Sequence, residues 1–232
     1  MDIQALIQQL LRAGDHPHPD LLAAILACEE AAVEPLIAII SDPEMYWDRR
    51  RSQPRWLPEI AMGLLGDLRA EAAIPTLIEL LKWHNMHERL EQVVTTLASI
   101  GPAAIEPAKA VILDRALDWF PRSMAARSLV IQVYREPESS QALLQFLCDL
   151  VSRGPIKSPD DRIIYTLLAH DLADLQGLDA LDVIQAAFER GAVDRFYLDW
   201  PDAETMCRNA APDLLRRHAG DFLTAYRAQL GR

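Results

Sequence analysis

Apolar residues recur along most of the chain at the spacing of an amphipathic α-helix. In the segments 74–81, 90–97 and 143–150 they stand at positions i, i+3, i+4 and i+7, which places them on one helical face. No segment shows the sustained alternation of apolar and polar residues that is typical of a half-buried strand. The sequence therefore predicts an all-α protein in which strands are improbable.

The predicted helices come in pairs that share a turn signature. A first helix ends at Gly66 or Gly101, and a second helix begins with Pro75 or Pro107 in its first turn. Glycine tolerates the left-handed backbone of a helix C-cap, and proline loses no hydrogen bond at a helix start. Three further copies, of which the last two lack the proline, lie at residues 32–40, 140–144 and 177–181. A period of roughly 30–45 residues with two helices indicates a repeat array.

The stretch 65–77 carries the most specific pattern, L-G-x-L-R-x-x-x-A-I-P-x-L. This pattern resembles the HEAT repeat, including its short form in phycobilin lyases, and the resemblance extends over about residues 20–190. Through its acidic N-terminal helix pair, its central repeats and the segment 184–197, the whole chain resembles a bacterial family of uncharacterised HEAT-like proteins. The resemblance implies a right-handed α–α superhelix of the HEAT or armadillo type, with about five helix pairs.

We expect one solenoid domain over residues 1–232. Its expected parts are an N-terminal helix pair (1–42), a loop insertion (43–58), the repeats (59–190) and a C-terminal cap (191–232). Within the repeats, Ser158 followed by Pro159 and two acidic residues predicts a helix start. In the cap, apolar residues from 219 to 230 form a stripe on the last helix, and a solenoid needs such a helix to shield its end.

The composition narrows the possible partners and the compartment. The formal net charge is -11, and an acidic surface repels the phosphate backbone of nucleic acids. The longest apolar runs are shorter than the ~18 residues of a membrane span, and the N-terminus lacks the features of a signal peptide. Cys28, Cys148 and Cys207 are far apart and form no C-x-x-C pair, which favours a reducing compartment. We therefore expect a cytoplasmic protein that binds neither nucleic acid nor membrane.

The insertion at 43–58 holds the candidate binding residues, which are arginines and aromatic residues. They are Tyr46, Trp47, Arg49, Arg50, Arg51, Arg55 and Trp56. Guanidinium and aromatic groups together bind acidic peptides or single-stranded nucleic acid, and long loops of repeat proteins tend to lie on the binding face. Alternatively, the arginines pair with Glu44, Asp48 and Glu59 while the tryptophans cover the core. If the insertion binds a partner, alanine at Trp47, Arg50 and Trp56 should abolish its capture.

Histidine-containing groups allow one enzymatic alternative. His170 and Asp171 match the central dipeptide of HD-type metal phosphohydrolases, whose metal shell needs a further histidine and aspartate. His84 and His87 stand three residues apart, close enough on a helix to share a metal. The same residues equally fit the polar faces of amphipathic helices, so we expect no metal site.

Two further alternatives rest on relatives of the HEAT fold. Some DNA base glycosylases use tryptophans and a carboxylate, a pairing that Trp119 with Asp114 or Asp118 would imitate. However, the second helices of the predicted pairs are acidic and would repel a DNA duplex. A phycobilin-lyase-like role rests on the short repeats alone. The sequence therefore predicts a non-enzymatic scaffold or adaptor for a protein or peptide, without cofactor or catalytic residue.

Overall fold

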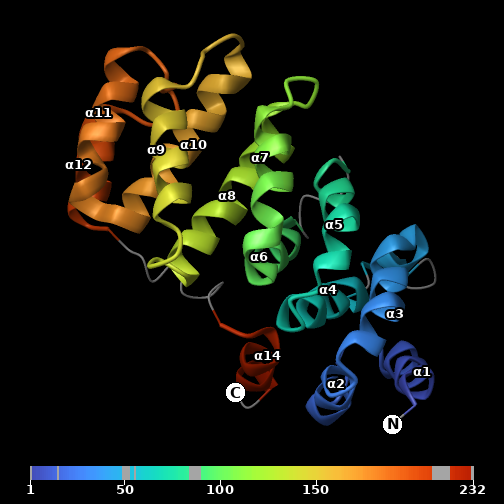
Figure 1. Cartoon of the computed structure of the whole chain (residues 1–232). Helices are drawn as coiled ribbons and strands as arrows, with labels where there is room; N and C mark the ends of the chain where they lie inside the picture. Colours follow the sequence, from blue (N-terminus) through green and yellow to red (C-terminus); the bar gives the residue numbers. More distant parts are fainter. Residues whose placement is uncertain are drawn as a thin grey trace. The chain divides into compact units, whose positions relative to one another are not determined.

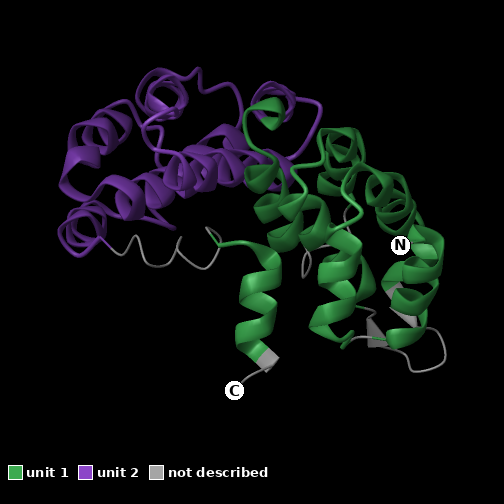
Figure 2. Cartoon of the chain, turned by 60° about the horizontal axis from the view of Figure 1, so that its bottom comes forward, with its two compact units in different colours: residues 1–104, 220–232 green, residues 105–219 purple. Residues whose placement is uncertain are grey.

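A computed structural model describes residues 2–14, 16–48, 53–54, 56–83, 90–210 and 220–230. Helices make up most of this part of the chain (Figure 1), which confirms the predicted all-α class. The chain divides into two compact units (Figure 2): unit 1 comprises residues 1–104 and 220–232, and unit 2 comprises residues 105–219.

Unit 1 combines the first helices of the chain with the last one. Its elements are α1 (Ile3–Ala13), α2 (Pro19–Leu26), α3 (Glu30–Ser41), η1 (Pro43–Tyr46), β1 (Trp47–Asp48), β2 (Gln53–Pro54), α4 (Leu57–Asp67), η2 (Glu71–Ala73), α5 (Ile74–Leu81), α6 (Leu90–Ile100), η3 (Pro102–Ala104) and α14 (Phe222–Leu230). Helix α4 packs against α3 and α6, and α1 packs against α2 and α3. The antiparallel ladder of β1 with β2, two residues a strand, is an exception to the expected absence of strands.

Unit 2 is built around two long helices, α8 and α10. Its elements are α7 (Ile105–Leu113), α8 (Trp119–Arg135), α9 (Gln141–Arg153), α10 (Pro159–Gln176), η4 (Gly177–Ala180), α11 (Leu181–Glu189) and α12 (Trp200–Arg208). Helix α8 packs against α7 and α10, α9 packs against α11, and α12 packs against α10.

The periodic apolar positions form the cores of the units. Leu77 and Leu97 in unit 1 and Leu147 in unit 2 are fully buried, as their helical spacing predicts. The helix start at Ser158 is also confirmed, because its hydroxyl accepts a hydrogen bond from the Asp161 amide while the Asp161 carboxylate accepts one from the Ser158 amide. Such a capping box satisfies two amides that lack partners in the helix.

The turn after α4 differs from the prediction. Gly66 lies inside α4, and the left-handed residue is Arg69, with a φ of 49°. Gly66 serves packing instead, because a Cβ there would lie 3.2 Å from the Cβ of Ser99 on α6. At the next copy the glycine prediction is confirmed, since Gly101 has a φ of 93°, a backbone conformation that glycine adopts without steric cost.

Helix α14, the last helix of the chain, packs within unit 1. Its packing contacts are with α2 and α4 of unit 1 (Figure 1). The Asp67 carboxylate, at the end of α4, accepts hydrogen bonds from the amides of Phe222 and Leu223 at 2.6 and 2.9 Å. This helix therefore packs against early helices of the chain within unit 1.

In the described part of the chain, no single helix has the length and apolar character needed to cross a bilayer. The segments Leu90–Ile100 and Pro102–Leu113 have that length and composition only when taken together.

Candidate functional site

The predicted site in the insertion is only partly within the described residues. Arg49, Arg50, Arg51 and Arg55 lie outside them, and of Trp47 only the backbone, in β1, is described. Tyr46 is buried: its hydroxyl donates a hydrogen bond to the Ile40 carbonyl oxygen at 2.7 Å, and its ring meets that of Trp83 edge-on. Trp56, just before α4, is 49% exposed.

Tyr46 thus stabilises unit 1, and Trp56 presents part of its ring to solvent. Binding of a partner by the insertion at 43–58 stays a prediction, because the structure describes none of the four arginines of this insertion. Two acidic residues of the predicted second helices have local partners: Glu79 pairs with Lys82 at 2.7 Å, and Glu106 pairs with Lys109 at 2.8 Å. Exposed pairs of this kind solvate a helix face and contribute little to stability.

His170 and Asp171 do not form the centre of a metal site in the described residues. The Asp171 carboxylate is buried and faces α8, where Arg127 Nη1 lies 2.7 Å from its Oδ1. Over the ranges that the structure describes, no three histidine, cysteine or acidic side chains are grouped as metal ligands. His84 and His87 lie outside those ranges. The HD-type interpretation therefore has no support from this geometry.

Asp171 is expected to make stability depend on pH. Burial raises its pKa to about 6, against the opposing effect of Arg127 and with a smaller contribution from Asp174. The folded state therefore keeps the proton to a higher pH than the unfolded chain does. The free energy of unfolding should fall by up to about 3 kcal/mol as the pH rises from about 4 to about 6, and then level off.

Urea unfolding at several pH values checks this expectation. Asp171→Asn should remove the fall between about pH 4 and about pH 6, because the amide does not titrate. The matched control is Asp182→Asn, at an exposed position on α11, which should leave the fall in place. An Asp171→Asn variant with the same pH dependence as the unmodified protein would contradict the assignment.

The residues of the glycosylase alternative have structural roles. The Asp118 carboxylate caps α8 by accepting a hydrogen bond from the Phe120 amide at 3.0 Å, and Asp114 accepts one from the Ala116 amide at 2.9 Å. The Trp119 ring contacts the Phe120 ring edge-on. Both carboxylates thus fix the chain between α7 and α8.

A buried ion network joins α7, α8 and α10. Asp161 is completely buried, and its carboxylate accepts hydrogen bonds from Arg115 and Arg122 and from the amides of Lys157 and Ser158. Burial alone would raise the pKa of Asp161, but these donors and the two guanidinium charges lower it below its ordinary value. Arg122, itself buried, also donates to the Ile112 carbonyl oxygen. Because these groups bond to one another within unit 2, the network holds α7, α8 and α10 together.

An open groove of about 550 Å³ lies where α11 meets the start of α12. Its lining residues are Gln185, Phe188, Glu189, Arg195, Asp199, Trp200 and Pro201. The rings of Phe188 and Trp200 meet edge-on, with centroids 5.5 Å apart, and give the groove an aromatic wall. We call this feature the α11–α12 groove.

The segment between α11 and α12 also carries two exposed aromatic side chains. Phe196 is 88% exposed and Tyr197 is 57% exposed, and their rings meet edge-on at 5.2 Å. The turn is fixed by Asp194, whose carboxylate accepts a hydrogen bond from the Phe196 amide and whose own amide donates one to Thr166 on α10. A turn whose backbone is fixed in this way loses little conformational freedom when it binds.

Arg195 is the cation of the groove. It is exposed, and among the described residues no hydrogen bond or ion pair of its guanidinium group is found. The neighbouring carboxylates already accept hydrogen bonds, Glu189 from Gln185 and Asp199 from the Asp202 amide. The groove therefore combines an aromatic wall, two exposed rings and a guanidinium group that is available to an anion.

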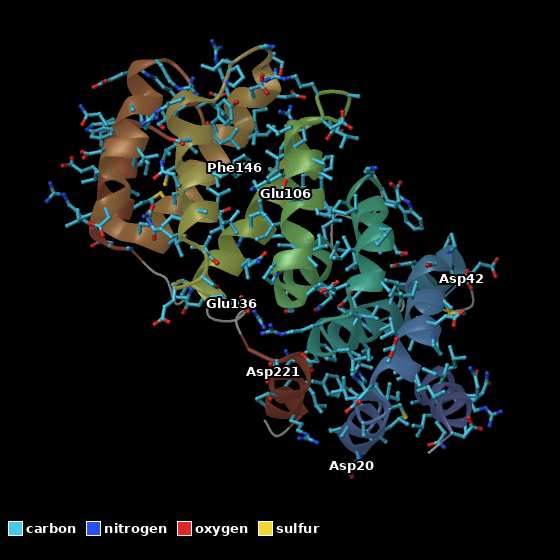
Figure 3. All side chains as sticks on the ribbon, in the orientation of Figure 1. Asp20, Asp42, Glu106, Glu136, Phe146 and Asp221 are labelled. Atoms are coloured by element: carbon cyan, nitrogen blue, oxygen red, sulfur yellow. The ribbon has the colours of Figure 1, made fainter. Side chains whose placement is uncertain are left out.

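A second groove, of about 470 Å³, lies between α1 and α3 in unit 1. It is lined mainly by aliphatic side chains, with Glu34 and Asp42 as its acidic members; Asp42 is labelled in Figure 3. None of the described residues that line it is aromatic. The α11–α12 groove offers more of the residue types that dominate binding energy at protein interfaces, which are aromatic residues and arginine.

Comparison with known families gives a match over most of the chain. A family model described as "Protein of unknown function (DUF1186)" matches residues 1–222. None of the curated proteins compared with the chain matches it.

Proposed function

Because that match covers nearly the whole chain, the protein belongs to the DUF1186 family. We propose that it is a non-enzymatic scaffold that binds a peptide segment of a partner protein. The proposed binding site is the α11–α12 groove of unit 2 together with Phe196 and Tyr197. The observation that carries the proposal is the exposure of these two adjacent rings on a turn fixed by hydrogen bonds. Burial of such rings is a main source of affinity at interfaces.

We also propose that the helix pairs form a HEAT-type superhelix. A recurring local arrangement supports it: in three places a short 3-10 helix leads directly into a second helix. These are η2 with α5, η3 with α7 and η4 with α11. Arrays of such pairs bind other proteins more often than they catalyse reactions, and loops on one side often supply the contacts.

The chemistry of the groove defines the proposed ligand. An apolar side chain would lie against Phe188 and Trp200, and neighbouring apolar residues would cover Phe196 and Tyr197. An acidic residue beside them would pair with Arg195, whose guanidinium group binds carboxylates bidentately. The ligand is therefore a short segment that combines apolar residues with a carboxylate.

Selection from a displayed library of random peptides on the immobilised full-length chain tests this function. We expect enrichment of peptides with that combination, and at least tenfold weaker binding of a selected peptide to Arg195→Glu. The matched control is Arg162→Glu, which makes the same charge change at another exposed position of unit 2. If no peptide is enriched, or if both variants bind as the unmodified protein does, the proposed function is wrong.

A further inference from the structure

Several hydrogen bonds of the turn between α11 and α12 meet at Asp194. Its carbonyl oxygen accepts hydrogen bonds from the amides of Tyr197 and Leu198, at 3.0 and 3.2 Å, and its carboxylate accepts one from the Phe196 amide at 3.0 Å. These bonds close the turn on itself. The Asp194 amide donates in the other direction, to the Thr166 hydroxyl on α10 at 2.8 Å. The place of both exposed rings relative to α10 therefore depends on where Asp194 is held.

The Thr166 hydroxyl is arranged to accept this bond. Thr166 is fully buried, and its hydroxyl donates its proton to the Arg162 carbonyl oxygen at 2.6 Å. A hydroxyl has one proton and two lone pairs, so the oxygen can only accept a second hydrogen bond. Bonding of a threonine hydroxyl to the carbonyl one turn earlier slightly destabilises a helix. The residue thus costs α10 some stability, and its oxygen supplies an acceptor for the turn.

The apolar contacts of the turn do not replace this bond. Val193 and Leu198, on either side of the exposed residues 195–197, are buried. Burial of apolar surface is non-directional, whereas a hydrogen bond has a preferred angle. The apolar residues therefore hold the turn against unit 2, and the bond between Thr166 and Asp194 fixes its orientation.

We propose that Thr166 is a positioning residue of the peptide-binding site. Through the Asp194 amide, its hydroxyl holds Phe196 and Tyr197 in the orientation that a peptide binds, although Thr166 itself is buried and does not line the groove. The inference rests on the proposed function, because it concerns the same site. Without the hydroxyl, the turn must be ordered during binding, and that ordering reduces the affinity.

Two substitutions at position 166 of the full-length chain separate the hydroxyl from the shape of the side chain. Thr166→Val keeps the branched shape and removes the acceptor, and Thr166→Ser keeps the hydroxyl. We expect Thr166→Val to weaken a peptide selected on the unmodified chain about fivefold, the usual contribution of one hydrogen bond, and Thr166→Ser to bind as the unmodified chain does. Thr166→Ala, a second variant without the hydroxyl, should behave as Thr166→Val does. In the free protein, hydrogen–deuterium exchange at residues 194–198 should be faster in the variants without the hydroxyl.

The matched control is Thr96→Val in unit 1. Thr96 is also buried, and its hydroxyl donates a hydrogen bond from α6 to the Met62 carbonyl oxygen on α4 at 3.1 Å. The same substitution there should lower the melting temperature and leave both the peptide affinity and the exchange at 194–198 unchanged. All affinities are measured where circular dichroism shows each variant to be folded.

The outcomes separate this inference from the proposed function. If the unmodified chain binds a selected peptide and Thr166→Val binds it equally tightly, the positioning role is wrong and the proposed function stands. Equal losses of affinity in Thr166→Val and Thr166→Ser also overturn the role of the hydroxyl. If the unmodified chain enriches no peptide, both are wrong.

Discussion

Replacing Asp161 with alanine is expected to lower the free energy of unfolding by about 3–5 kcal/mol, the usual cost of removing one partner from a buried ion pair. The substitution leaves the buried Arg122 without its carboxylate partner and removes the acceptor for the amides of Lys157 and Ser158. Because these groups lie on or next to α8 and α10, unit 2 should lose most of the stability. Urea unfolding, followed by circular dichroism, measures the change.

Asp160→Ala is the matched control. Asp160 stands beside Asp161 in the first turn of α10 but outside the network, so its loss should cost only about 0.3–1 kcal/mol through the helix dipole. The contribution of Asp161 to stability should also be lost in acid. The pKa of Asp161 is lower in the folded protein than in the unfolded chain. The stabilisation is therefore present above the pKa of the unfolded chain and disappears as the pH falls through the pKa of the folded protein. Equal losses for the two alanine variants would contradict the role of the network.

Replacing Phe196 and Tyr197 together with alanine is expected to weaken a selected peptide about thirtyfold or more. Aromatic residues at the centre of an interface commonly contribute about 2 kcal/mol or more, which corresponds to that factor. The melting temperature should stay unchanged, because both side chains are exposed in the free protein. Fluorescence anisotropy gives the affinity, and a thermal melt gives the stability.

Leu178→Ala is the control for this pair, since Leu178 is a 59% exposed apolar residue elsewhere in unit 2. It should change neither affinity nor stability. If the double variant binds as tightly as the Leu178→Ala variant, the two rings are not part of the site.

Helices could be predicted because their signals are local. The periodic leucines, the capping box at Ser158 and the glycine at 101 are all read within one or two turns. The neighbours of α14 could not be predicted in this way. Asp67 contacts a segment more than a hundred and fifty residues later, and an aspartate at a helix end has no local pattern that indicates such a partner.

The candidate site was harder to predict, because side chains of one type have different environments. Tyr46 and Trp56 belong to the same insertion, yet one is buried and the other is half-exposed. Phe188 and Phe196 are eight positions apart, and only the structure shows that the first forms a wall while the second points to solvent. In the sequence, Phe196 follows Asp194 and Arg195 and precedes Tyr197 and Leu198, a mixture that does not distinguish an exposed ring from a cap residue.

Hydrogen–deuterium exchange of the full-length protein, with and without a selected peptide, tests the central claim most directly. We predict that the peptide slows exchange in residues 185–202, which carry the α11–α12 groove and the turn with Phe196 and Tyr197, and leaves residues 43–58 unchanged. Slower exchange at 43–58 with no change at 185–202 would contradict the claim and assign binding to the insertion.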